Sequence, residues 1–160
     1  LYAKGHRVIG IIGDRPEISR PSQQRLDGCL DAMQRLGVPF DFDRQYVLAD
    51  FSMQGGYAAA EHLLAHCPGL TAIFAMSDLM AVGAIRAILD HGLRVPQDIA
   101  VAGYDGIALG RYTAPRLTTI RQNTTALAER AADILLRCIE ENAPATHEIV
   151  PFELVEGESV

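Results

Sequence analysis

The stretch Thr71–Gly106 reads TAIFAMSDLMAVGAIRAILDHGLRVPQDIAVAGYDG, and its pattern decides the fold. Residues 72–76 form a short apolar run, after which apolar residues recur at helical spacing until Gly92. Residues 99–103 form a second apolar run. A strand, a helix and a strand in this order predict a βαβ unit, whose strands lie parallel across a right-handed crossover.

The same alternation of strand and helix extends along the rest of the chain. The further patterns are strands at Arg7–Ile12, Gln45–Leu48 and Leu117–Ile120, helices from Ser22 to Leu36, from Ser52 to Leu64 and from Thr124 to Glu141, an irregular helical turn at Ile107–Tyr112, and two short strands, Ile149–Val150 and Glu153–Val155, on either side of Pro151. Successive βα steps predict an α/β fold with a mainly parallel sheet flanked by helices.

The composition bounds the function. The 160 residues are 49% apolar, which suffices for one compact domain with a full core. A formal net charge of −6 argues against nucleic acid binding by this chain itself, because phosphate binding needs a basic face. No apolar run is long enough to span a membrane, no signal-peptide pattern opens the chain, and the three cysteines are scattered. These features predict a cytoplasmic protein with no membrane partner.

Polar and aromatic side chains follow the strands of the predicted sheet. Arg25 lies in the helix after the first strand, Phe51 follows the second, Ser77 and Asp78 follow the third, and Asp105 follows the fourth. Open parallel sheets bind ligands beyond the carboxyl ends of their strands. A carboxylate accepts hydrogen bonds from neighbouring hydroxyls, an arginine donates several, and an aromatic ring covers the apolar face of a pyranose. The pattern therefore suits a sugar.

Each of these residues also has a purely structural interpretation. Asp78 stands where a helix begins, and a role as its N-cap is favoured over direct ligand contact. Ser77 suits the same capping role, and Phe51 suits a hydrophobic staple. Asp105 suits a turn, and Arg25 suits an ion pair with a nearby acid. The order along the chain alone does not decide between these alternatives.

No motif in the chain supports catalysis or a cofactor. GxGxxG, the Walker A loop and the GxSxG elbow are absent, and Ser77 has no histidine near it in sequence to act as a base. His62 and His66 lie four residues apart on a helix, but no third ligand accompanies them. We therefore expect a protein that is not an enzyme and that holds neither a cofactor nor a metal.

Six motifs in register resemble the sensor domain of the LacI/GalR family of bacterial transcription regulators. They are GHRVIGIIG at 5–13, RLDG at 25–28, TAIFAMSDLMAVGA at 71–84, GLRVPQDIAVAGYDG at 92–106, PRLTTIRQ at 115–122 and LVEGESV at 154–160. Any one of them is weak evidence, but their shared order and spacing are specific. Together they span essentially the whole chain.

The resemblance implies a type I periplasmic-binding-protein-like fold with two α/β lobes and an effector bound between them. Residues 1–122 would form the C-terminal lobe, residues 123–146 would cross to the N-terminal lobe, and residues 147–160 would return. The family's DNA-binding helix-turn-helix lies at its N-terminus and is absent from this chain, which would be the second half of such a protein. Operator DNA would be bound only through that missing domain.

The resemblance also assigns site residues. Arg25 of RLDG and Asp105 of GYDG would be the effector-binding pair. Phe51 would take the aromatic position, Ser77 the polar position after the third strand, and Gln122 the position near the lobe crossing. Ser77 stands where the family often has a longer amide side chain, so the ligand's hydroxyl pattern does not transfer from a relative.

The resemblance further implies a homodimer. The family's dimer interface uses this lobe, which makes the helix from Leu79 to His91 the candidate surface, with Val82 facing the partner. Gly157 stands where the family commonly has an arginine, so any role of that arginine does not carry over.

The leading hypothesis is an effector-sensing, dimerising part of a transcription regulator, and a sugar is the expected effector. A sugar-binding protein for uptake shares the fold and is the first alternative. A small α/β enzyme is the alternative from another class. Nothing in the sequence decides whether effector releases DNA or promotes its binding.

Overall fold

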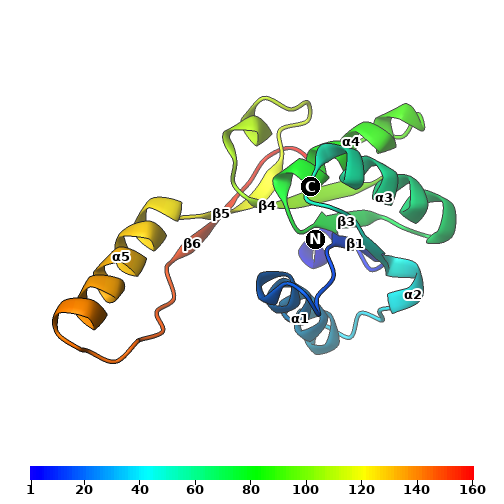
Figure 1. The fold of residues 1–160 in the computed structure, drawn as a ribbon. Helices are drawn as coiled ribbons and strands as arrows, with labels where there is room; N and C mark the ends of the chain where they lie inside the picture. The colour runs from blue at the N-terminus through cyan, green and yellow to red at the C-terminus, as the bar shows by residue number, and fades with distance from the viewer.

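The computed structural model describes residues 1–160 and contains one six-stranded sheet with helices on both faces (Figure 1). The strands are β1 (Ile9–Gly13), β2 (Tyr46–Leu48), β3 (Ala72–Ala75), β4 (Ala100–Asp105), β5 (Thr118–Gln122) and β6 (Phe152–Val155). Their order in the sheet is β2-β1-β3-β4-β5-β6. β1 to β5 are parallel, and only β6 runs antiparallel, beside β5. The predicted α/β class is confirmed.

The helices follow the strands in alternation. They are η1 (Tyr2–Lys4), α1 (Arg20–Arg35), α2 (Phe42–Gln45), α3 (Met53–His66), α4 (Asp78–Asp90), η2 (Ala108–Arg111) and α5 (Thr124–Glu140). α3 and α4 pack against each other on one face of the sheet, and α1 lies on the other (Figure 1). The βαβ unit predicted for residues 71–106 is therefore β3, α4 and β4.

A small polar side chain marks the start of each long helix. Ser19, Ser52, Ser77 and Asn123 precede α1, α3, α4 and α5, and each accepts a hydrogen bond from the backbone N–H three residues later. Such caps satisfy an otherwise unpaired N–H and stabilise a helix by about 1 kcal/mol. Local sequence therefore determines where these helices begin.

The core lies along the central strands and beneath α4. Ile11 of β1 and Ile73 of β3 are fully buried, because helices cover the middle of the sheet on both faces. Met80 and Ile88 of α4 are also fully buried, which confirms the helical stripe seen in the sequence. A side chain at Gly83 of α4 would overlap the backbone of α3, so glycine permits the close approach of these two helices.

The structure contains one helix that was not expected and lacks one expected strand. α2 was not predicted, because four residues are too few to show a helical period. Ile149–Val150 is not a strand: β6 begins only at Phe152, and Ile149 is 82% exposed. Strand pairing needs a partner, and β5 ends opposite Phe152. β4 in turn extends to Asp105, beyond its apolar run, because it pairs with β5 as far as Arg121.

α5 stands away from the rest of the molecule at the end of a two-stranded ribbon formed by β5 and β6 (Figure 1). None of its residues is buried, and the apolar side chains Leu127, Leu135 and Ile139 are 50%, 59% and 69% exposed. On its polar side, Asp133 and Arg137 form an ion pair at 3.5 Å. Much of the apolar stripe of this helix is therefore left uncovered by the rest of the chain.

The structure contains neither a disulfide bond nor a helix suited to span a membrane. Cys29, Cys67 and Cys138 are all free. None of the helices combines the length and the apolar character needed to cross a membrane.

Candidate functional site

The carboxyl ends of the five parallel strands meet at one edge of the sheet, and most of the predicted binding residues lie there. Ser77 follows β3, Asp105 ends β4 and Gln122 ends β5. Arg25 approaches the same edge from α1. Parallel strand order therefore brings together residues that are up to 97 positions apart in sequence, from Arg25 to Gln122.

Arg25, Asp105 and Gln122 form one contact cluster. The Nη2 of Arg25 lies 3.7 Å from Oδ1 of Asp105, and Nε2 of Gln122 donates a 2.8 Å hydrogen bond to the same oxygen. Arg25 also donates to the Met76 carbonyl at 2.8 Å, which fixes its guanidinium beneath the rim. The Asp105 carboxylate keeps its second oxygen for other partners. A ligand hydroxyl can donate to that oxygen.

The guanidinium of Arg25 also stacks on Tyr104, with its central carbon 4.1 Å from the ring centroid. The sequence reasoning did not assign Tyr104 a role. Tyr104 stands directly before Asp105 in GYDG, and this position next to a predicted ligand residue was the only hint of its role in the sequence. The ring orients the fork of Arg25 from one side while Met76 holds it from another.

Asp105 has a raised pKa and an unusual backbone conformation. Burial raises its pKa, the positive charge of Arg25 and the hydrogen bond from Gln122 lower it, and the nearby charge of Asp78 raises it further. Its backbone φ is +117°, a value that residues other than glycine rarely adopt. Strained residues of this kind occur most often at binding and active sites, so both observations favour a functional role over an ordinary turn.

Ser77, and not Asp78, caps the start of α4. The N-cap is Ser77, whose hydroxyl accepts from the Met80 N–H, so the predicted cap role of Asp78 is wrong. The carboxylate of Asp78 instead turns inward, where it accepts hydrogen bonds from the Thr119 hydroxyl and the Ile107 N–H. Ser77 is 4% exposed, and its place at the end of β3 keeps it near the rim.

Phe51 lies apart from the cluster in the sheet. It follows β2, an edge strand that β1 and β3 separate from β4. The residue is 39% exposed, so part of its surface is open to solvent. Its role as the aromatic wall stays a prediction.

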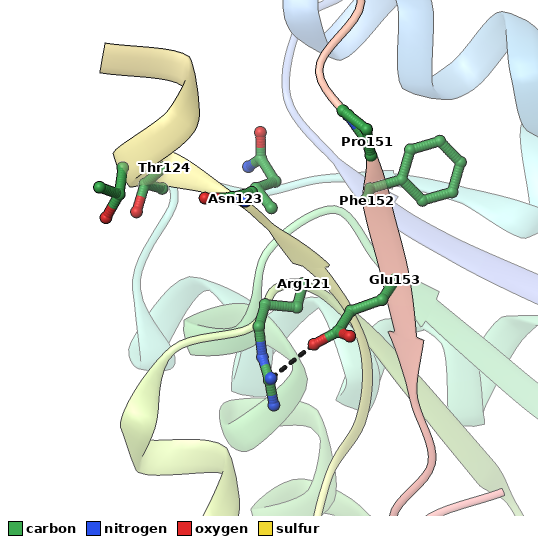
Figure 2. Close-up of a pocket in the computed structure, with 8 residues that line it drawn as sticks. Arg121, Asn123, Thr124, Pro151, Phe152 and Glu153 are labelled. Atoms are coloured by element: carbon green, nitrogen blue, oxygen red, sulfur yellow. Dashed lines mark hydrogen bonds and ion pairs between the residues drawn. The ribbon is translucent and has the colours of Figure 1, made fainter. Parts of the chain in front are cut away.

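A polar hollow of about 420 Å³ lies beside Gln122, where the β5–β6 ribbon leads into α5 (Figure 2). It is lined by Arg121, Gln122, Asn123, Thr124, Thr125, Pro151, Phe152 and Glu153. Nη1 of Arg121 lies 2.5 Å from Oε1 of Glu153. Figure 2 shows the two side chains directed at each other and the Phe152 ring turned away from the pair. The hollow continues the polar rim from Gln122 towards α5.

A second hollow is unsuited to a polar ligand. It measures about 460 Å³, and 13 of its 16 lining residues are hydrophobic. It lies against α1 and the sheet face between Ile9 and Leu154, away from the Arg25–Asp105 pair. The cluster at the rim is therefore the better candidate for a polar effector.

The predicted homodimer residues lie on α4. Leu79 and Val82 are half-buried, so each keeps part of its side chain at the surface.

His62 and His66, the two histidines for which the sequence offered no third metal ligand, stack on each other with ring centroids 4.2 Å apart. No group of three or more histidine, cysteine, aspartate or glutamate side chains is arranged to hold a metal ion.

The sequence and the fold are similar to those of known bacterial regulators. The family model of the periplasmic binding protein-like domain matches residues 1–160. The HTH-type transcriptional repressor PurR of Escherichia fergusonii is 40% identical over 164 residues, which is 100% of this chain and 47% of the repressor. The chain therefore spans about half the length of the curated relatives it matches.

Two solved structures share the fold closely. The complex of the transcriptional regulator CelR with cellobiose has a TM-score of 0.93 at 31% identity, over 100% of this chain and 49% of the regulator chain. The Lac repressor dimer bound to operator and the anti-inducer ONPF has a TM-score of 0.90 at 30% identity, over 99% of this chain and 47% of the repressor chain. These relatives are named as regulators and repressors, not as enzymes.

Proposed function

The chain belongs to the periplasmic binding protein-like domain family, alongside the effector-binding domains of LacI/GalR-family regulators, and we propose that it senses a small polar effector for a DNA-binding protein. The observation that carries this proposal is the Arg25–Asp105–Gln122 cluster at the carboxyl edge of the sheet. Its carboxylate and guanidinium suit a ligand rich in hydroxyls, and the proposed effector is a sugar. Ser77 and Phe51 would complete the site on the β3 and β2 sides.

The proposed site is one side of a cleft between two lobes. Residues 1–122 would form one lobe, residues 123–146 would cross to the other, and residues 147–160 would return. The exposed apolar stripe of α5 supports this division, because such a stripe normally packs against a partner surface. The polar hollow beside Gln122 lies where the crossing begins.

The proposed mechanism is a population shift. Effector would favour one arrangement of the two lobes, and the dimer would transmit that arrangement to separate DNA-reading domains. The net charge of −6 supports placing operator contact outside this chain. The proposed protein works by binding rather than catalysis, without a cofactor, and in the cytoplasm.

A thermal-shift assay on the full-length protein tests the effector class. We expect a sugar from a panel of mono- and disaccharides, cellobiose included, to raise the melting temperature, because a ligand at 100 times its Kd stabilises the folded state by about 2.7 kcal/mol. Purine bases form the second arm of the panel, since the LacI/GalR framework also suits them. A shift with purines alone would overturn the sugar assignment, and no shift with either arm would count against the sensing role.

The proposed homodimer can be tested at Val82. Replacing Val82 with Asp places a charge at the centre of the proposed α4 interface, and we expect the dimer dissociation constant to rise at least about a hundredfold, since an unpaired charge in an apolar interface costs several kcal/mol. Sedimentation velocity over a range of concentrations measures the change.

A control separates this effect from added charge. Gln34→Asp introduces the same charge at an exposed position of α1, on the opposite face of the sheet, and should leave association unchanged. Equal sedimentation of Val82→Asp and the unaltered protein would assign the interface to another surface.

A further inference from the structure

Asp78 is the one fully buried acidic residue in the chain, and it lies directly behind the proposed effector site. Its Oδ1 accepts a hydrogen bond of 2.5 Å from the Thr119 hydroxyl of β5, and its Oδ2 accepts one of 2.8 Å from the Ile107 N–H. Burial raises the pKa of Asp78, and these two hydrogen bonds lower it. A buried carboxylate that has lost its water is stabilised chiefly by such donors.

The turn that Asp78 contacts is the one that carries Asp105. Asp105 has a φ of +117°, Gly106 follows with +75°, and Ile107 donates its N–H to Asp78. A residue held in so rare a conformation persists only where its surroundings over-determine it. The hydrogen bond at Ile107 fixes the far end of the turn, while the pairing of Asp105 with Arg121 fixes its near end.

The local sequence leaves room for this arrangement. A Cβ at Gly103 would overlap Oδ1 of Asp78, so the glycine of GYDG allows the carboxylate to reach between β4 and β5. Thr119 is 4% exposed and lies on β5 opposite Gly103. Asp78 thus joins three elements: the first turn of α4, the β4 exit and β5.

We propose that Asp78 is a positioning residue that holds Asp105 in its ligand-facing conformation through Ile107 and Thr119. The proposal rests on the proposed function, because it gives Asp78 a role in a site that binds effector through Asp105. Asp78 is also the first residue of α4, the helix with the proposed dimer surface. A displacement of α4 would therefore move the turn that carries Asp105. Asp78 thus connects the proposed dimer helix to the proposed effector site.

Nuclear magnetic resonance of the effector-free chain tests the positioning directly. The three-bond HN–Hα coupling of Asp105 reports φ, and the hydrogen exchange of the Ile107 amide reports its bond to Asp78. We expect a small coupling and a slow Ile107 amide in the unaltered chain. In Thr119→Val, which removes the donor to Asp78 and keeps the side-chain shape, the coupling should shift towards extended values and the Ile107 amide should exchange about tenfold faster.

Thr119→Ser is the matched control, because it keeps the hydroxyl and removes a buried methyl. If the role of Thr119 were packing alone, serine would disturb the turn at least as much as valine. We expect serine to retain the unaltered coupling and exchange, and Asp78→Ala, where it folds, to exceed the effect of valine. Unchanged values at Asp105 and Ile107 in Thr119→Val would overturn the proposal.

Effector affinity provides the functional readout in the full-length protein. With the sugar that gives the largest thermal shift as the probe, Thr119→Val should weaken binding about tenfold and Thr119→Ser should not. Unchanged affinity in Thr119→Val would also overturn the positioning role. The coupling of Asp105 and the exchange of the Ile107 amide are measured without effector. They would therefore still test the positioning role of Asp78 if the chain proved not to sense an effector.

Discussion

Asp105→Asn is expected to abolish effector binding by the full-length protein while leaving its fold intact. The asparagine keeps the shape of the side chain but loses the charge that pairs with Arg25 and that, in the proposed site, would accept ligand hydroxyls. Two charge-assisted hydrogen bonds contribute about 1.5–3 kcal/mol each, so the affinity should fall at least about a hundredfold. Asparagine also tolerates positive φ better than most residues, and the backbone at +117° should therefore be retained.

Although Asp105→Asn should weaken effector binding, it should not lower the stability of the fold at neutral pH. Burial raises the pKa of Asp105 in the folded state above its value in the unfolded chain. A raised carboxyl pKa favours the folded state below the unfolded pKa, and that contribution is lost as the pH rises through the folded pKa. The unaltered protein should therefore lose stability relative to Asp105→Asn between acidic and neutral pH. At neutral pH the variant should be at least as stable.

Calorimetric titration with the effector and chemical unfolding at two pH values check these expectations. Asp31→Asn is the matched control, because Asp31 lies on the exposed side of α1 and pairs only with Arg35, at 3.3 Å. It should bind effector with unchanged affinity. An Asp105→Asn variant that binds as tightly as the unaltered protein would remove Asp105 from the site. A variant that binds weakly because it has lost stability would reduce Asp105 to a structural residue.

In the isolated chain, the amides of α5 are expected to exchange with solvent about a thousandfold or more faster than those of α4. Helix stability in proteins comes mostly from packing an apolar face against other elements, so a helix whose apolar face is largely unpacked opens readily. α5 buries no residue, whereas Met80, Ala84 and Ile88 of α4 are fully buried. The most protected amides open only with global unfolding, which for a typical domain costs about 5–15 kcal/mol.

Hydrogen exchange followed by mass spectrometry resolves the two helices on separate peptides. Dilution is the control, because self-association at high concentration could cover the apolar stripe of α5. Protection of α5 in the full-length protein, together with its absence in the isolated chain, would support the proposed crossing to a second lobe. Slow exchange of α5 in the dilute chain would mean that the stripe is already covered, which would contradict the lobe division.

Local patterns were sufficient to predict most of the elements. β1 and β3 are inner, apolar strands, and α1, α3 and α4 carry apolar faces and follow the capping residues Ser19, Ser52 and Ser77. α2 escaped prediction because it is too short to show a period. The supposed strand at Ile149–Val150 failed because strand identity depends on a pairing partner that local sequence does not reveal.

In the candidate site, too, the positions of the residues could be predicted from the sequence, but some of their contacts could not. Residues at strand ends are visible in the sequence, and the structure brings Arg25, Asp105 and Gln122 into contact as the parallel order requires. The stacking of Tyr104 under Arg25 and the inward turn of Asp78 towards Thr119 depend on side-chain directions across different strands. No spacing rule along the chain encodes those directions.

Local patterns along the chain were enough for the α/β class, the approximate positions of the long helices and the edge of the sheet where polar residues gather, because helical and strand periodicity act over a few residues. The three-dimensional packing was needed to show that Ser77 caps α4 while Asp78 accepts a hydrogen bond from the Ile107 N–H, beyond Asp105. Both residues offer an oxygen at the start of one helix. Which oxygen meets the helix N–H, and which meets Thr119, depends on how closely β4, β5 and α4 pack around Gly103.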